Sequence, residues 1–210
     1  MKLYTYFRSS AAYRVRIALN VKGLEYESLP RHLTRNGGEH RQRDYLELNP
    51  QGLIPLLIDA DATIAQSLAI IEYLDETHPD PALLPKDAIA RAQARALAQI
   101  IACDIHPLNN VGALRYLKRE MHQEQSAIDA WYHHWVSEGF EAFEALAQPG
   151  PYACGNKVTV ADLCLVPQVY NARRLKVPLE KFPKIVGIDA ACLKLPAFDR
   201  ARPENQPDTE

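Results

Sequence analysis

The chain of 210 residues carries a formal net charge of −2 at neutral pH and is 47% hydrophobic, which is enough to bury a core as one large domain or two small ones. Its 24 basic residues are scattered among 26 acidic ones, without the single-signed block typical of phosphate-backbone binders, which argues against a nucleic acid partner. No apolar segment is long enough for a membrane span, the N-terminus shows no signal-peptide pattern, and the 4 cysteines form no C-x-x-C pair, so we expect a cytoplasmic protein with reduced thiols and no membrane partner.

The first part of the chain alternates strand-like and helix-like patterns. In chain order we predict a strand at 3–7, a helix that ends at Gly23, a strand at 26–29, a short helix at 41–48, strands at 54–58 and 63–65, and a helix at 68–77. Pro55 must lie at the start or edge of its strand, because proline cannot donate a ladder hydrogen bond. The pattern predicts an α/β domain over residues 1–80 with the order βαβαββα.

A cluster of prolines between residues 79 and 85 marks a domain boundary, after which long helical patterns begin. Helices are predicted at 88–118, 126–147 and 160–174, within an all-helical domain over residues 86–210. Thr159 and Asp162 form an acidic variant of the capping box, which fixes the start of the third of these helices. The tail from Arg202 is polar, contains further prolines and is expected to be loose.

The segment from Phe7 to Leu19 places Ser9, Ser10 and Arg14 where the first strand ends and the first helix begins. Unpaired backbone N–H groups and the positive end of the helix dipole favour an anion at such a point, and a thiolate could be held there. The alternative is that one of the two serines is only an N-cap.

Four motifs cover nearly the whole chain in order and at sensible separations. They read R-S-S-A-A-Y-R-V-R-I-A-L, L-N-P-Q-G-L-I-P-L-L, I-A-Q-S-L-A-I-I-E-Y-L and V-A-D-L-C-L-V-P-Q-V. Together they resemble the zeta class of glutathione transferases, the maleylacetoacetate isomerase family. The resemblance implies the glutathione transferase fold, in which a thioredoxin-like βαβαββα domain precedes an all-helical domain. It also implies glutathione as the cofactor and a homodimer.

The activity implied by this resemblance is glutathione-dependent cis-trans isomerisation of maleylacetoacetate to fumarylacetoacetate, a step of aromatic amino acid catabolism. It proceeds by reversible addition of the thiolate to a small maleyl keto acid. Alternatives with the same site are a maleylpyruvate isomerase and a general zeta-class transferase acting on small α-haloacids. Val111 and Gly112 add no positive charge after Asn109 and Asn110, which favours maleylacetoacetate over the shorter substrate.

Two other classes of protein fit the sequence less well. A non-catalytic module of the same fold could lose its thiolate serines and the Gln66-Ser67 pair, and this chain retains both. A glutaredoxin-like thiol oxidoreductase needs a cysteine in its first domain, and residues 1–80 contain none.

By the resemblance, Ser9 and Ser10 are the hydroxyls that hydrogen-bond the glutathione sulfur, and we favour Ser9. The family usually has a cysteine where this chain has Ala11, and this difference removes one contact with the thiol. A free thiol with a pKa of about 8.5 is only slightly ionised at neutral pH, and lowering that pKa by about two units requires roughly 2.7 kcal/mol. The helix dipole, a serine hydroxyl and Arg14 are expected to supply this stabilisation together.

Three further segments are expected to bind glutathione. A cis Ile54-Pro55 bond would turn the Ile54 backbone toward the cysteinyl backbone of the ligand, although a proline here could also simply block a strand edge. Gln66 and Ser67 begin a helix without a Glu or Gln three residues later to complete a capping box, so the helix end is open to the γ-glutamyl carboxylate that the resemblance implies. The resemblance also implies His40 as a glutathione-binding residue.

Two arginines are expected to bind the substrate. Arg8 directly precedes the serines, and Arg174 matches the family's arginine near the end of its helix. The carboxylates of a maleyl keto acid suit bidentate guanidinium contacts. The alternative for either arginine is a surface ion pair, and the neighbouring Arg173 is expected to be solvated.

The stretch from Asp104 to Asn110 lies inside the predicted helix at 88–118, and Pro107 should kink that helix. The matching family segment borders the active site. His106 and Asn110 are therefore expected to contact glutathione, and Asp104 to reach the site of a partner subunit. The alternative for His106 is a residue that only caps the kink. No cluster has metal-ligand spacing, so no metal is predicted.

Overall fold

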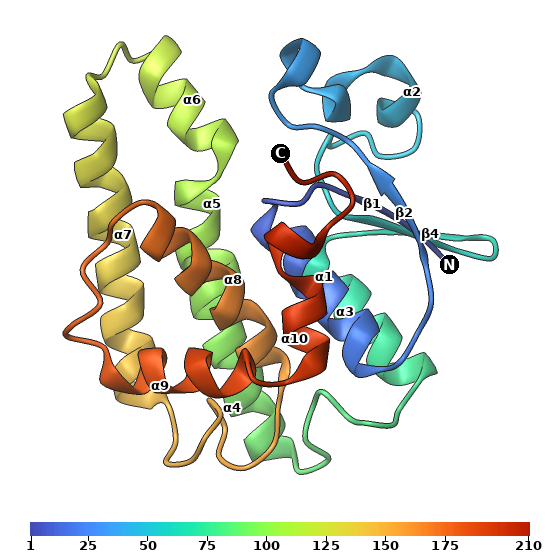
Figure 1. The fold of residues 1–210 in the computed structure, drawn as a ribbon, viewed down its shortest axis with the longest axis vertical. Coiled ribbons are helices and arrows are strands. Elements are labelled where there is room, and N and C mark those ends of the chain that lie inside the picture. The colour runs from blue at the N-terminus through green and yellow to red at the C-terminus, as the bar shows by residue number, and fades with distance from the viewer. The chain divides into compact units, whose positions relative to one another are not determined.

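The computed structural model describes residues 1–210 and divides the chain into two units. The first unit comprises Met1–Leu83 together with Leu193–Glu210, and the second comprises Leu84–Cys192. The first unit contains the four-stranded sheet, and the second is built from helices (Figure 1).

The sheet of the first unit has the strand order β2-β1-β3-β4. β1 (Lys2–Thr5) pairs in parallel with β2 (Glu27–Pro30) and antiparallel with β3 (Leu56–Asp59), and β3 pairs antiparallel with β4 (Ala62–Ala65). The parallel pair requires a crossover, which α1 (Ser10–Val21) supplies, whereas the antiparallel pair β3–β4 needs only a tight turn. With α3 (Ser67–Thr77) at its end, the unit has the predicted order βαβαββα.

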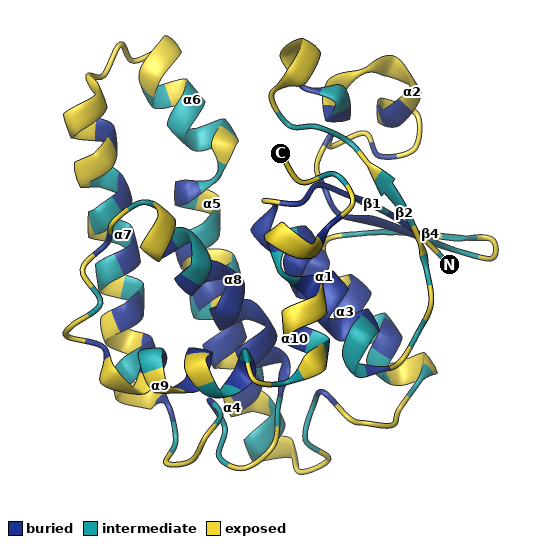
Figure 2. Cartoon of the chain, viewed as in Figure 1, coloured by how far each residue is buried: buried dark blue, intermediate teal, exposed yellow.

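The central helix of the first unit, α1, is covered by two other helices. α1 packs against both α3 and α10 (Pro196–Ala201), so its residues from Ala12 to Leu19 are buried on all sides, as the dark blue helix in Figure 2 shows. Gly23, with φ +66°, ends the helix as predicted. The single short helix predicted at 41–48 is instead split into short turns. These are η1 (Arg35–Gly37), η2 (Glu39–Arg41) and α2 (Arg43–Leu46).

β1 ends at Thr5, earlier than the strand predicted at 3–7. The carbonyl oxygens of Tyr6 and Phe7 accept hydrogen bonds from the Arg16 guanidinium at 3.2 and 2.9 Å. The Phe7 N–H donates to the carboxylate of Asp208 at 2.9 Å. Because side chains satisfy these backbone groups, they do not pair with a neighbouring strand, and the aromatic residues continue as a turn.

Residues 193–210 belong to the first unit, which corrects the predicted helical domain over residues 86–210. Asn20 Nδ2 donates to the Ala197 carbonyl at 3.0 Å, and Arg16 Nε donates to the Ala201 carbonyl at 3.2 Å. The tail predicted to be loose is held as well, since η4 (Pro203–Asn205) follows α10 and the Gln206 side chain is buried. These contacts join residues almost two hundred positions apart, and local sequence patterns carry no signal for them.

The second unit is organised around α8 (Val160–Arg174), whose residues 160–169 are all buried (Figure 2). Its other helices are α4 (Ala88–Gln99), the π-helical η3 (Ile100–Ile105), α5 (His106–Asn109), α6 (Val111–Arg119), α7 (Gln125–Leu146) and α9 (Pro183–Cys192). The helices predicted at 126–147 and 160–174 agree closely with α7 and α8, whereas α9 and α10 were not predicted as individual helices.

The helix predicted at 88–118 is wrong as a single element. Pro107 has no N–H to donate to the carbonyl four residues earlier, and the π-helical segment η3 immediately precedes that point. Asn110 then adopts an extended backbone, with φ −72° and ψ 164°, which ends α5 and begins α6. The kink predicted at Pro107 is therefore part of a longer interruption.

The capping box predicted for α8 is present. Asp162 Oδ2 accepts from the Thr159 N–H at 2.8 Å, and Asp162 Oδ1 accepts from the Ala153 N–H at 2.8 Å. Burial raises the pKa of this carboxyl, and the hydrogen bonds act in the opposite direction. The carboxylate thus links the loop before α8 to the helix start.

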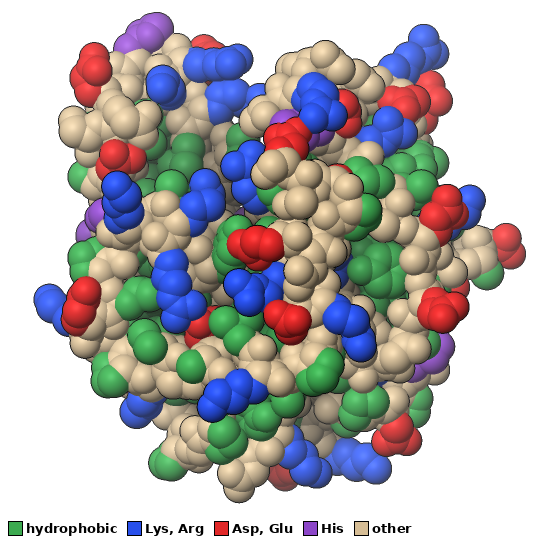
Figure 3. All heavy atoms as spheres, in the orientation of Figure 1, with side chains coloured by type: hydrophobic (Ala, Val, Ile, Leu, Met, Phe, Trp, Pro, Cys, Tyr) green, Lys and Arg blue, Asp and Glu red, His purple; other side chains and the backbone are tan.

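On the face shown in Figure 3, basic and acidic side chains are interspersed over the surface of each unit, without a large area of one sign. None of the helices combines the length and the apolar character that crossing a bilayer requires.

The buried ammonium group of Lys22 holds the segment that follows α3. Lys22 is fully buried and donates to Asp75 Oδ1 at 2.5 Å, to the His78 carbonyl at 2.6 Å and to the Pro81 carbonyl at 2.7 Å. Asp75 also accepts from the Leu83 N–H at 2.7 Å. All three ammonium protons are therefore used to tie α1 to the segment that leaves α3.

Replacement of this ammonium should destabilise the protein strongly. Lys22→Met leaves Asp75 without its cation and two carbonyl oxygens without a donor, and we expect a loss of about 3–5 kcal/mol in the free energy of unfolding by chemical denaturation. Lys2 is the matched control, because it pairs with Glu27 at 3.7 Å with both side chains more than half exposed, and Lys2→Met should cost less than about 1 kcal/mol. Equal losses for the two variants would contradict this assignment.

Candidate active site

The first helix begins at the predicted serine pair. Ser9 is the N-cap of α1, with φ −70° and ψ 114°, and its Oγ accepts a hydrogen bond from the Ala12 N–H at 3.2 Å. Ser10 is the first residue of the helix, and both serines are buried. A hydroxyl that accepts one hydrogen bond still has its own proton to donate. The cap role of Ser9 is therefore compatible with donation to a bound sulfur.

Ala11 lies beside these hydroxyls in the first turn of α1 and is partly buried. Its methyl group offers neither a donor nor an acceptor. The first-turn N–H groups of the helix and the two serine hydroxyls are thus the polar groups at this helix end.

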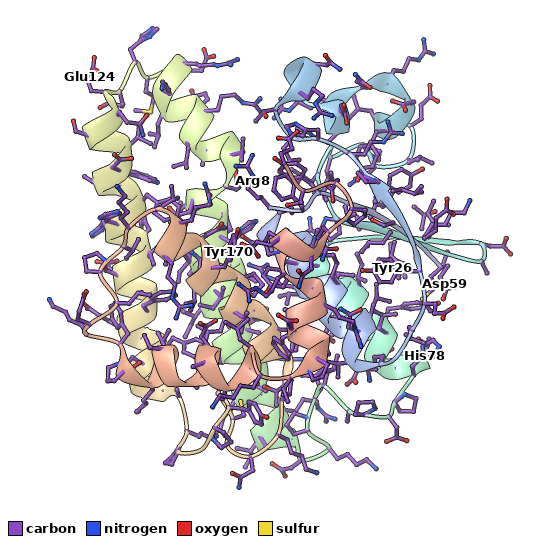
Figure 4. The ribbon with its side chains drawn as sticks, in the orientation of Figure 1. Arg8, Tyr26, Asp59, His78, Glu124 and Tyr170 are labelled. Carbon is purple, nitrogen blue, oxygen red and sulfur yellow. The ribbon has the colours of Figure 1, made fainter.

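Arg8 is exposed and lies over the aromatic residues that precede it. Its Nη2 donates to Tyr6 Oη at 3.0 Å, and its guanidinium carbon is 4.8 Å from the centroid of the Phe7 ring. Figure 4 labels Arg8 at the turn between β1 and α1. The two rings hold the guanidinium plane by hydrogen bonding and cation–π attraction, and its remaining N–H groups are available to a carboxylate.

The Ile54-Pro55 bond is cis, as predicted. The preceding residue is held firmly, because the Leu53 carbonyl accepts from Tyr45 Oη at 2.7 Å and from Asn49 Nδ2 at 2.8 Å. The strand β3 begins only at Leu56. Tyr45 and Asn49 were not predicted to support this loop, because their burial, which requires hydrogen-bond partners, is not visible in the sequence.

The third helix presents an open N-terminus. Gln66 occupies the N-cap position with φ +71°, and no side chain caps the helix. Gln66 Nε2 donates to Gln51 Oε1 at 2.8 Å, a partner that the sequence did not suggest. Ser67 is therefore the first residue of α3 rather than its cap, and the first-turn N–H groups are available to an anion.

Arg14 is connected to this second helix end. It is buried, and its Nη1 donates to Ser67 Oγ at 3.2 Å. From its position in the sequence, Arg14 was expected to help stabilise a thiolate at the start of α1. The hydrogen bond instead brings its positive charge next to Ser67, where a carboxylate at the N-terminus of α3 would gain from it.

His40 is buried in η2, next to a glycine with an unusual backbone. Gly38 has φ +106°, and a Cβ at this position would lie 2.6 Å from His40 Cε1. The glycine therefore leaves the space that the imidazole occupies.

The second unit contains the other predicted arginine. Arg174, at the end of α8, is exposed, and its Nη2 makes a long hydrogen bond of 3.4 Å to Asn171 Oδ1. Its charge also acts on the buried Tyr132, whose pKa is raised to about 12 mainly by burial. Arg173, which was expected to be solvated, instead forms an ion pair with the buried carboxylate of Asp189. The two neighbouring arginines therefore differ, since one has a carboxylate partner within its unit and the other is weakly held.

Three predicted residues surround Pro107 in the second unit. Asp104 is exposed in η3, and His106 is partly buried at the start of α5. Asn110 caps α6, since its Oδ1 accepts from the Ala113 N–H at 3.0 Å and its Nδ2 donates to the Pro107 carbonyl at 3.0 Å. A structural role for Asn110 is thus present, and contact of these three residues with glutathione remains a prediction.

Buried contacts join several of the segments that carry the candidate residues of the first unit. A buried cluster packs Phe7 against Ile54 and thereby joins the turn before α1 to the loop before β3; its members are Tyr6, Phe7, Ala12, Tyr45, Ile54 and Leu56. Arg14 links the start of α3 to α1. These contacts join two helix N-termini and the residues before β3 within the first unit, and helix N-termini are groups to which anions bind.

Comparison with known proteins agrees with this arrangement. Residues 1–76 match the glutathione S-transferase N-terminal domain, and residues 115–195 match the C-terminal domain. The chain is 50% identical over 208 residues to a probable maleylacetoacetate isomerase of Vibrio cholerae, covering 98% of this chain and 97% of that protein. It is 48% identical over 213 residues to a maleylpyruvate isomerase of Ralstonia, with 100% of each chain covered.

Solved structures give the same result. A holo maleylpyruvate isomerase, described as a bacterial glutathione S-transferase of the zeta class, matches with a TM-score of 0.97 and 48% identity over 100% of each chain. A maleylacetoacetate isomerase from Anaeromyxobacter dehalogenans with glutathione bound in its active site matches with a TM-score of 0.89 and 38% identity, covering 100% of this chain and 97% of that one. The chain belongs to the glutathione S-transferase family, in the zeta-class branch of the maleylacetoacetate isomerases.

Proposed function

We propose that this chain is a glutathione-dependent cis-trans isomerase that converts maleylacetoacetate to fumarylacetoacetate. The observation that carries the proposal is the buried serine pair at the N-terminus of α1, together with the uncapped N-terminus of α3 in the same unit. Relatives at 50% and 49% identity named as maleylacetoacetate isomerases support this choice of substrate.

The residues of the first unit fit glutathione by their chemistry. Ser67, the amides at the start of α3 and the Arg14 guanidinium would hold the γ-glutamyl carboxylate, and the Ile54 backbone would pair with the cysteinyl residue. Ser9 would donate its hydroxyl proton to the sulfur, with Ser10 next to it. When bound, glutathione supplies a thiolate that adds reversibly to the cis double bond, which allows rotation about that bond before the thiolate leaves.

The protein's own task is to stabilise negative charge. Arg8 and Arg174 would bind carboxylates of the keto acid and stabilise the charge that develops on the substrate during the reaction. Arg8 is suited to this because Tyr6 and Phe7 fix its orientation by a hydrogen bond and by ring contacts, neither of which neutralises its charge. Arg174 is suited because its contact with Asn171 is long and easily exchanged.

Maleylpyruvate is the second candidate substrate. A maleylpyruvate isomerase of Ralstonia is 48% identical to this chain, and a holo maleylpyruvate isomerase matches its fold with a TM-score of 0.97. The absence of added positive charge in Asn109-Asn110-Val111-Gly112 still favours maleylacetoacetate. Action on small α-haloacids would use the same thiolate site. The assembly we propose is a homodimer, and the compartment is the cytoplasm.

Turnover of the two keto acids distinguishes these possibilities. Purified protein should convert maleylacetoacetate to its fumaryl isomer rapidly, only with glutathione present, and with a higher kcat/KM than for maleylpyruvate when both reactions are followed by absorbance. A higher kcat/KM for maleylpyruvate would reassign the substrate. Binding of glutathione without turnover of either acid would leave conjugation or dehalogenation as the activity.

The serines at the two helix ends should have separable effects. Ser9→Ala removes the proposed hydrogen bond to the ionised sulfur. We therefore expect the thiol pKa of bound glutathione to rise by about 1–2 units and kcat to fall about 10- to 100-fold at neutral pH. Ser67→Ala should weaken glutathione binding by about tenfold with little change in the thiol pKa. Thiolate absorbance against pH and calorimetric titration measure these quantities.

Two controls accompany the serine experiment. Ser9→Thr keeps the hydroxyl and should retain most activity, whereas Ser10→Ala should have the smaller effect of the two alanine variants. A larger loss in Ser10→Ala than in Ser9→Ala would exchange the roles of the two residues.

The two arginines at the end of α8 form a matched pair of variants. Arg174→Ala should lower kcat/KM for the keto acid by roughly 10- to 100-fold, because a charge-assisted contact with a carboxylate is lost, and should leave glutathione affinity unchanged. Arg173→Ala removes the partner of the buried Asp189 and should mainly lower thermal stability. Undiminished turnover in Arg174→Ala would remove this residue from the substrate site.

A further inference from the structure

The last residues of the chain return to the turn that precedes the serine pair. The Phe7 N–H donates to Asp208 Oδ2 at 2.9 Å, and this contact joins the two ends of the sequence within the first unit. In Figure 1 the red C-terminal segment lies beside the blue α1, in agreement with the packing of α10 on that helix. The segment Gln206–Glu210 is called the C-terminal strap below.

The strap is anchored on both sides of Asp208. Gln206 is buried, and its Nε2 donates to the carbonyl oxygens of Arg200 at 2.9 Å and Arg202 at 2.8 Å. At the other end, Glu210 forms an ion pair with Arg35 and lies 3.4 Å from His32 Nε2. Asp208 is thus presented to Phe7 by a segment that is itself fixed.

The backbone on both sides of Phe7 is held. In the Tyr6–Phe7 peptide the Phe7 N–H donates to Asp208 and the Tyr6 carbonyl accepts from Arg16 Nη1 at 3.2 Å. The Phe7 carbonyl, in the next peptide, accepts from Arg16 Nη2 at 2.9 Å. The next two residues are Arg8, the candidate carboxylate ligand, and Ser9, the candidate thiol donor. Because these residues follow directly in the chain, fixing the two peptides that flank Phe7 limits the directions in which both side chains can leave the backbone.

The carboxylate of Asp208 is unusual in its surroundings. Its Oδ1 is buried and has no hydrogen-bond partner in the structure. A buried oxygen without a partner lowers the stability of the fold, so its retention calls for an explanation. Its negative charge opposes the effect of burial on Arg16, whose pKa is lowered to about 10. Asp208 therefore contacts the same peptide as Arg16 and also compensates the charge of that buried cation.

We propose that Asp208 is a positioning residue of the active site, which accepts the Phe7 N–H and thereby holds the turn of Arg8 and Ser9 in the orientation needed to ionise bound glutathione. This inference rests on the proposed thiolate site at Ser9. The strap contributes no group to the glutathione or the substrate itself. Its effect passes through the backbone of the turn.

Three variants in the full-length chain test the proposal, with ionisation of bound glutathione as the readout. Asp208→Ala removes the acceptor, and we expect the pKa of the bound thiol to rise by about one unit and kcat to fall about tenfold at neutral pH, with little change in KM. Asp208→Asn retains a side-chain oxygen as acceptor and should stay within about twofold of the wild type. Thr209→Ala, an exposed neighbour in the strap, should be unchanged.

Several outcomes would overturn the inference. It fails if Asp208→Ala ionises glutathione like the wild type, if it loses activity without a change in the thiol pKa, or if Asp208→Asn is as impaired as Asp208→Ala. Melting temperatures measured alongside separate these effects from unfolding. Wild-type protein that binds glutathione without lowering its thiol pKa would refute the thiolate site itself, and this inference with it.

Hydrogen exchange of the wild-type chain supplies a test that does not depend on the folding of a variant. The Phe7 amide of the wild type should be protected from exchange, because it donates to the Asp208 carboxylate. Exchange of this amide in the wild type at the rate of an exposed peptide would contradict the hydrogen bond on which the proposal depends.

Discussion

The hydrogen bonds of the Arg16 guanidinium are the interactions on which the turn before α1 depends. The guanidinium is completely buried in α1 and donates to Thr5 Oγ1 and to the carbonyl oxygens of Tyr6, Phe7 and Ala201. Burying an unpaired cation is expensive, so these acceptors and the nearby Asp208 are what make the position tenable. The same bonds end β1, turn the aromatic residues away from the sheet and attach the C-terminal segment. A lysine could not replace this group, because only a planar fork with five N–H donors reaches four acceptors on two separate segments, residues 5–7 and Ala201.

Two arginines on one helix perform different tasks because of their spacing. Arg14 and Arg16 are two positions apart, so their side chains leave α1 in different directions. Arg14 reaches Ser67 at the start of α3, whereas Arg16 supports the turn at the start of α1. A single helix therefore carries one cation to the proposed carboxylate end of glutathione and another behind the proposed thiol end. This arrangement explains why the R-V-R segment lies in a helix that is otherwise apolar and buried on all sides.

Sequence patterns predicted the parts of this site whose causes are local. The stop at Gly23, the cis bond before Pro55 and the capping box of Asp162 each follow from chemistry within a few residues, and the structure contains all three. The N-cap at Ser9 corresponds to the alternative that the sequence left open for one of the two serines. Long-range contacts account for what was missed. The early end of β1 follows from Arg16 and Asp208. The fixed C-terminal segment follows from donors in and before α1, almost two hundred residues away in sequence. Arg14 was assigned to the thiol end because its helix position was known and its partner was not.

Ala11, in the first turn of α1, has a methyl side chain that cannot donate a hydrogen bond, so the orientation of the neighbouring serine hydroxyls matters more. With alanine at this position, stabilisation of a thiolate in the proposed site would come from the hydroxyls of Ser9 and Ser10 and from the amides of the first helical turn. A hydrogen bond from a hydroxyl weakens steeply when its angle departs from linearity, so its contribution depends on where the backbone aims the side chain. A site with fewer donors loses a larger share of its stabilisation to a small misorientation. The hydrogen bonds that Arg16 and Asp208 make with the backbone on either side of Phe7 would limit that misorientation, which gives the charges at this turn a role in aiming the proposed hydroxyl donor.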